Sequence, residues 1–128
     1  MSLGNWSEDA MLDWLLGGGT TPTRPSARYV SLHSADPGET GANELSAAAY
    51  SRNAASFTAA SGGASSNSGT LSWSNTSGSA WPSATHFGVW DAASGGHFLG
   101  GGALTQGGAI AAGGSGSFAA GELDVTLD

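Results

Sequence analysis

Histidines and carboxylates are the residues of this chain that could carry chemistry, and three of them lie at regular spacing. His33, Asp36 and Glu39 are three residues apart and could converge at the end of a strand, where they would offer nitrogen and oxygen ligands to a metal ion. A dedicated calcium loop needs several oxygen ligands at fixed offsets, and this segment does not match that pattern. We therefore expect Asp36 to cap a turn, and we expect no metal site.

His86 and His97 are the second candidate pair. They flank a predicted hairpin and would then be cross-strand neighbours. Two such histidines could bind zinc at the axis of a trimer, but a zinc site takes three or four protein ligands, and no third ligand is evident. A cross-strand pair on the surface is the expected arrangement.

Catalytic constellations are weak in this sequence. Glu39 and Glu44 are the carboxylate pair that a glycosidase would require, yet both lie in one polar loop with no aromatic cluster beside it. The chain has no cysteine, which excludes thiol catalysis and disulfides, and it has no G-x-S-x-G nucleophile elbow. Residues 113–116 are glycine-rich but lack the lysine and following helix of a phosphate-binding loop. We expect a protein that is not an enzyme and that has no cofactor.

The charge balance limits the partners of the chain. The formal net charge is −7, lysine is absent, and Arg24, Arg28 and Arg52 are the only strongly basic residues. A nucleic-acid interface requires a cationic surface, and an anionic membrane surface attracts the same kind of patch. No apolar run approaches the roughly 20 residues that span a bilayer, and the first residues lack the basic region of a secretory signal. We expect neither nucleic acid nor a membrane as a partner, and synthesis in a cytoplasm.

The element best able to position a contact is a helix at the start of the chain. Residues 5–16 carry Trp6 and Trp14 on one apolar stripe at helical spacing. Ser7 is the predicted N-cap, and the glycines at 17–19 end the helix.

A proline-containing linker then separates two units, a helical arm (residues 1–19) and a β domain (residues 20–128). Because aromatic and large apolar side chains dominate the centres of interfaces, Trp6, Trp14 and Leu15 form the predicted assembly interface. A helix that packs on its own domain is the alternative.

The rest of the chain predicts about seven or eight short strands at roughly 8–12-residue spacing, which is typical of a β-sandwich or jelly roll. The fold class is therefore mostly β, an antiparallel β-sandwich or jelly roll with one N-terminal α-helix. Because large apolar side chains are few, the five tryptophans must supply much of the core. Turns are expected at 36–38, 95–96 and 106–108, and flexible loops at 61–70 and 111–117. The predicted strands are residues 28–34, 48–55, 70–74, 84–91, 97–104, 109–112, 117–120 and 123–127.

Several long motifs resemble one family. Residues 29–45 read YVSLHSADPGETGANEL, which resembles the SLHTADPGxTGANEV signature of a small phage protein family often labelled tail fibre protein. The segments YSR (50–52), THFGVWDA (85–92) and FAAGELDVTLD (118–128) resemble further motifs of that family. The resemblance covers nearly the whole chain.

The resemblance implies a structural protein of a phage virion. Members resemble small β-sandwich proteins that form trimeric capsid decorations, so we expect a homotrimeric decoration or cement protein that binds the major capsid protein and stabilises the head shell. Such a contact would bury apolar area at about 25 cal/mol per Å² before the costs of association. The alternative is a tail fibre or baseplate component for host attachment, with Trp73, Trp81 and Trp90 as candidates for a glycan-binding groove.

Overall fold

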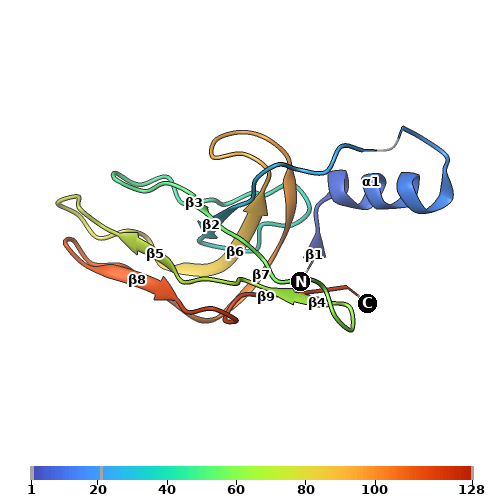
Figure 1. Cartoon of the computed structure of the whole chain (residues 1–128). Coiled ribbons are helices and arrows are strands. Elements are labelled where there is room, and N and C mark those ends of the chain that lie inside the picture. Colours follow the sequence, from blue (N-terminus) through green and yellow to red (C-terminus); the bar gives the residue numbers. More distant parts are fainter. Residues whose placement is uncertain (1, 21, 128) are drawn as a thin grey trace.

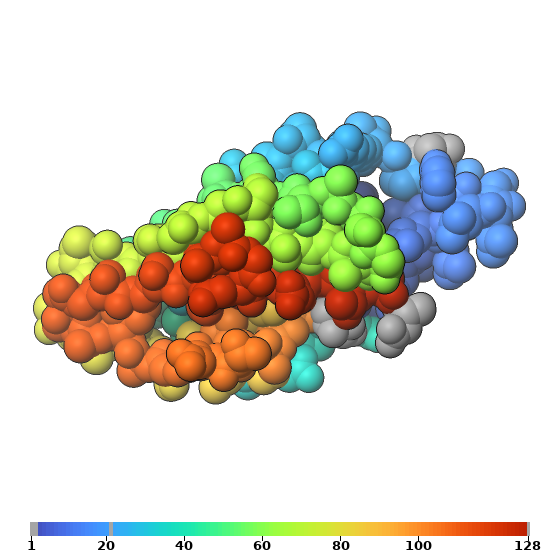
Figure 2. Space-filling view, turned by 60° about the horizontal axis from the view of Figure 1, so that its bottom comes forward, coloured from blue at the N-terminus to red at the C-terminus, as the bar shows by residue number. Residues whose placement is uncertain are grey.

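The computed structural model describes residues 2–20 and 22–127, and it shows an antiparallel β body with one helix at its end (Figure 1). The predicted mostly-β, antiparallel fold with one N-terminal helix is confirmed. The helix α1 (Asn5–Leu16) forms one end of an elongated molecule, and the strands β5 and β8 form the other, as Figure 2 also shows from a second direction. No helix among the described residues is long and apolar enough to cross a membrane.

The body has two layers. The first is a five-stranded sheet with the order β1-β7-β6-β2-β3, all pairs antiparallel: β1 (Ser2–Leu3), β7 (Phe98–Gly108), β6 (Ala84–Trp90), β2 (Tyr29–His33) and β3 (Asn53–Ala54). The second layer is divided into two ribbons rather than being one continuous sheet: β4 (Ala64–Ser66) with β9 (Asp124–Thr126), and β5 (Leu71–Ser74) with β8 (Ser115–Phe118).

The main core lies between the sheet and the ribbons. The cross-strand pairs Val30–Val89 and Leu32–Phe87 point to this side and are buried. Trp73 and Trp81 are 3% exposed, and their indole N–H groups donate to the carbonyls of Ser51 (2.9 Å) and Ala48 (2.8 Å). The prediction that tryptophans supply much of the core is therefore confirmed.

Glycines allow the sheet strands to approach each other closely. A Cβ on Gly101 would lie 2.5 Å from the Phe87 carbonyl, and one on Gly107 would lie 2.2 Å from the Ala84 carbonyl. The glycines near 107 therefore extend β7 beside β6, so the predicted turn at 106–108 is wrong. The following segment, 109–112, was predicted as a strand and is not one.

The segment 61–70, predicted as a flexible loop, contains β4. Asn67 explains why this serine- and glycine-rich segment is ordered. Its side chain is 1% exposed, its amide donates to the carbonyls of Gly69 and Ala119 (2.9 Å each), and its oxygen accepts from the Leu123 N–H (2.9 Å). One buried amide thus ties β4 to the segment that begins β9.

The bounds predicted for α1 are confirmed, but Ser7 is not its N-cap. The N-cap is Gly4, the residue between β1 and the helix, and it has no side chain that could form a capping hydrogen bond. The Gly4 N–H donates to the Leu99 carbonyl and the Asn5 N–H to the Glu39 carbonyl, both at 3.1 Å. A Cβ on Gly4 would lie 2.2 Å from the Phe98 carbonyl, so only glycine fits there.

Candidate assembly site at the N-terminal helix

The helix exposes more apolar surface than any other element among the described residues. Leu12, Trp14, Leu15 and Leu16 are 54%, 68%, 63% and 78% exposed. Single exposed apolar residues are normal on a protein surface, but a contiguous group marks an interaction site. The body anchors the base of this helix through β1, which pairs with β7.

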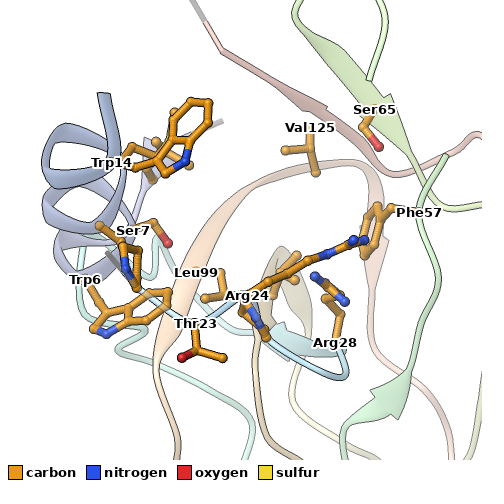
Figure 3. A pocket seen from close by; sticks show the side chains of 16 residues that line it. Trp6, Ser7, Trp14, Thr23, Arg24, Arg28, Phe57, Ser65, Leu99 and Val125 are labelled. Carbon is orange, nitrogen blue, oxygen red and sulfur yellow. The ribbon is translucent and has the colours of Figure 1, made fainter. Parts of the chain in front are cut away.

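An apolar groove of about 600 Å³ lies between α1 and the body (Figure 3). One wall is the inner side of the helix, and the other is built from the linker, β4, β9 and their neighbours. Its main apolar side chains are Trp6, Met11, Trp14, Pro25, Phe57, Leu99 and Val125. Trp14, predicted as an interface residue, therefore lines the groove, whereas Leu15 does not.

Two of the three arginines of the chain lie at this groove. Arg24 lies between the linker prolines Pro22 and Pro25 and Arg28 follows them, and Figure 3 shows the side chain of Arg24 extending toward Phe57. Neither has an ion pair among residues 2–20 and 22–127. The groove is thus apolar with unneutralised positive charge at its margin, in a chain whose net charge is −7.

A small polar cluster holds the base of the helix. Trp6 stacks on His97, with ring centroids 4.6 Å apart, and the His97 ring Nδ1 donates to Asp91 Oδ2 at 2.7 Å. Burial alone would raise the pKa of Asp91, but the hydrogen bonds from the backbone and ring of His97 outweigh it and lower that pKa. Trp6, the third predicted interface residue, is therefore half-buried against its own domain.

The signature segment 34–45 covers the second face of the sheet, where it encloses a buried hydrogen-bonded chain. The Trp90 N–H donates to Ser31 Oγ (2.8 Å), and the Ser31 hydroxyl then donates to His33 Nε2 (2.7 Å). His33 Nδ1 donates to the Ala42 carbonyl (2.6 Å). Because the carbonyl can only accept, Nδ1 carries a proton, and burial lowers the pKa of His33, which favours the neutral ring with Nε2 as the acceptor.

A buried ion pair borders this network. Arg52 and Glu44 form two hydrogen bonds of 2.9 and 2.8 Å, and the guanidinium lies 3.7 Å from the centroid of the Trp90 ring. The Tyr50 hydroxyl donates to Glu44 Oε1 (3.1 Å) and accepts the Leu32 N–H (2.9 Å). Burial raises the pKa of Tyr50. Residues of three of the four motifs of the family resemblance thus meet in one structural cluster, whereas the closing motif (118–128) contributes to β8 and β9.

The candidate metal ligands do not converge. Both ring nitrogens of His33 are used as described above, while the Asp36 carboxylate accepts the Gly38 N–H (2.8 Å), which confirms the predicted turn cap. His86 pairs with His33 and Ala103, so the expected pairing of His86 with His97 is wrong. The described part of the chain contains no group of three or more histidine, aspartate or glutamate side chains placed to hold a metal ion.

The carboxylates and tryptophans considered for glycan chemistry have other positions. Glu44 is engaged by Arg52 in the ion pair, and Glu39 is exposed. The predicted glycan-binding groove is wrong, because its tryptophans are core residues with exposures of 3%, 3% and 8%: Trp73, Trp81 and Trp90. Their aromatic surface faces the interior instead of solvent.

The fold and the groove first define a class: a small antiparallel β domain with a protruding apolar helix and an apolar groove at its base. By comparison with known families, the chain belongs to the family described as Podophage GP4 fiber I protein gp80, whose model matches residues 2–126. It is therefore a phage structural protein, as the signature resemblance implied. A search of curated proteins gives no match.

Proposed function

We propose that the chain is a non-enzymatic structural component of a podophage tail fibre, and that α1 and the groove beside it are its assembly site. The observation that carries this proposal is the exposed apolar face of a helix whose base is anchored in the sheet. Three leucines project from the body on this face, and covering them is favourable because burying apolar surface contributes a free energy of about 25 cal/mol per Å². The family description supports a fibre in preference to the capsid decoration that we expected from size and charge.

The distribution of buried groups agrees with a structural role. Several motif residues have side chains that could take part in catalysis, but they hydrogen-bond to each other or to main-chain groups. Examples are His33, Glu44 and Arg52. Among the described residues no buried polar side-chain atom lacks a partner. These side chains stabilise the fold and leave no unused group aimed at a substrate.

The location in the particle tests this proposal directly. Purified virions should contain the chain in a number set by the fibres, and gold-labelled antibodies against it should bind at the tail. Particles assembled without it should keep stable heads and lose adsorption to the host. A copy number on the scale of the capsid lattice, with label over the whole head, would contradict the fibre proposal and favour the decoration protein.

The assembly site has its own test in the same particles. A chain with Leu12, Leu15 and Leu16 all changed to serine should fold and be absent from purified virions, because the face to be covered has lost its apolar surface. Leu127→Ser is the matched control, since Leu127 is 44% exposed and lies outside the helix. Normal incorporation of the triple variant would contradict the assigned role of α1.

A further inference from the structure

The groove and the outer face of α1 are two different surfaces of one chain, and they are complementary. We propose that the outer face of α1 in one copy docks into the groove of a second copy, head to tail, so that the copies close into a ring. This inference rests on the proposed function, because it names the partner of the assembly site described above.

The outer face of α1 is defined by Leu12, Leu15, Leu16, Glu8 and Asp9. At 3.6 residues per turn these positions lie on the side of the helix opposite Trp6 and Ala10. None of the five lines the groove of its own copy, and all five are exposed. The face therefore consists of an apolar stripe with two carboxylates at the N-terminal end of the helix.

The groove presents the opposite pattern. Its lining is apolar, and its cations are Arg24 and Arg28. The third arginine, Arg52, is neutralised by Glu44 inside the fold. In a chain with ten acidic residues and three arginines, an acidic partner would be repelled by most of the surface and attracted here. An apolar helix face with carboxylates at one end fits this groove in both respects.

The placement of the two surfaces means that only another copy can bring them together. The inner side of α1 is a wall of its own groove, and the outer face points away from that groove, so a copy cannot fill its own site. Two copies could exchange their helices reciprocally in a two-fold dimer, whereas the head-to-tail contact proposed here is heterologous and produces closed rings or open filaments. The homotrimer expected from the sequence would be the smallest such ring.

The volume of the groove also suits such an occupant. The groove measures about 600 Å³, and most of the atoms that line it are apolar, so covering it with leucine side chains is favourable. Leu12 and Leu16 are one helical turn apart and would enter the groove together.

The test uses the full chain in solution and two variants that each destroy one surface. The arm variant carries Leu12→Asp and Leu16→Asp, and the groove variant carries Arg24→Glu and Arg28→Glu. Sedimentation and light scattering should show a ring for the unchanged chain and monomers for each variant, with dissociation constants raised about tenfold or more. Leu127→Asp, at an exposed leucine outside both surfaces, should leave the ring intact.

Mixing the two variants gives the sharpest result. The arm variant retains a good groove and the groove variant retains a good arm, so an equimolar mixture should form a one-to-one heterodimer and nothing larger. Far-ultraviolet circular dichroism and the fluorescence of the buried tryptophans verify that each variant is folded. Should the double groove variant fail to fold, Arg24→Glu alone, at an exposed position, replaces it.

Three results would overturn the inference: an unchanged chain that stays monomeric up to about 1 mM, where even a millimolar interface is populated; variants that assemble as the unchanged chain does; or a mixture with no heterodimer. A monomeric chain that is nevertheless found in tail fibres would leave the proposed function standing and show that another virion protein occupies the groove. A ring in solution together with antibody label over the head would support the docking of α1 into the groove and contradict the tail-fibre proposal.

Discussion

Removing the guanidinium of Arg52 is the perturbation whose cost the structure defines best. The side chain is 8% exposed and holds Glu44, which is 22% exposed, through two hydrogen bonds. It also donates to the carbonyls of Ala92 (2.9 Å) and Gly95 (2.8 Å) and lies on the Trp90 ring. Arg52→Met keeps most of the aliphatic length and removes all of these interactions.

The expected loss of unfolding free energy is about 3 kcal/mol. Removing one partner of a buried pair typically costs ~3–5 kcal/mol because the other charge is left buried and unpaired, and the partial exposure of Glu44 places this case at the low end. With an unfolding entropy of ~2.1 cal/mol/K per residue, this loss lowers the Tm of the 128-residue chain by about 11 °C.

The assay is urea unfolding followed by tryptophan fluorescence at low protein concentration, so that association contributes nothing to stability. Adding Glu44→Gln to Arg52→Met should restore about 1 kcal/mol, because no buried charge is then left unpaired and the amide oxygen still accepts from Tyr50. Arg24→Met, at an exposed arginine, should change stability by less than about 0.5 kcal/mol. A loss below ~1 kcal/mol for Arg52→Met, or a double variant no more stable than the single one, would refute this reasoning.

Three further predictions concern the sheet and its anchors. The pKa of His33 is lowered in the folded state, so below about pH 6.5 the unfolded chain binds a proton that the folded chain does not; stability should be full above that pH and fall as the pH drops below it, by at most ~1.4 kcal/mol per pH unit, and a pH titration of His33→Gln should lack this component. Gly101→Ala should cost about 2–3 kcal/mol in chemical denaturation because its Cβ would meet the Phe87 carbonyl, whereas Gly69→Ala, with open space around the Cβ, should be nearly neutral; equal costs would contradict the close-approach argument. Asn67→Ala should cost about 2–3 kcal/mol through unpaired buried groups and increase hydrogen exchange in β4 and β9, and unchanged exchange there would show that the amide is not the anchor.

The sequence predicts those strands whose apolar residues alternate with others. Leu71 and Trp73 define β5, and Phe87 and Val89 define the centre of β6, because large side chains at every second position must share a buried face. Strand β4 carries only alanine and serine and is held by the adjacent Asn67 through hydrogen bonds to the distant Ala119 and Leu123, so no local pattern predicts it. Gly107 lies in a glycine-rich segment that is typical of a turn, but glycine is required there because the backbone of β6 lies too close for a Cβ.

The candidate site was also predictable only in part. The apolar stripe of the helix predicts that Trp14 contacts another apolar surface, and the structure places it in the groove. Sequence reasoning missed the rest of the groove, because Arg24, Phe57 and Val125 come from separate segments that only the fold brings together. The one feature of the sequence that pointed to the groove is that two of the three arginines lie within or just after the proline-containing linker. The interface role of Trp6, Trp14 and Leu15 stays a prediction.

The ribbon of β5 and β8 lies at the end of the molecule farthest from α1, as both overall views show (Figures 1 and 2). The turn around Gly78, which follows β5, is exposed. The buried Asn75 fixes this turn by donating to the carbonyls of Ser79 (2.8 Å) and Ile110 (3.0 Å). A peptide inserted at Gly78 would therefore project from the pole opposite the assembly surfaces without crossing either of them. This pole is the natural point at which to graft an epitope or a receptor-binding sequence for display on the particle.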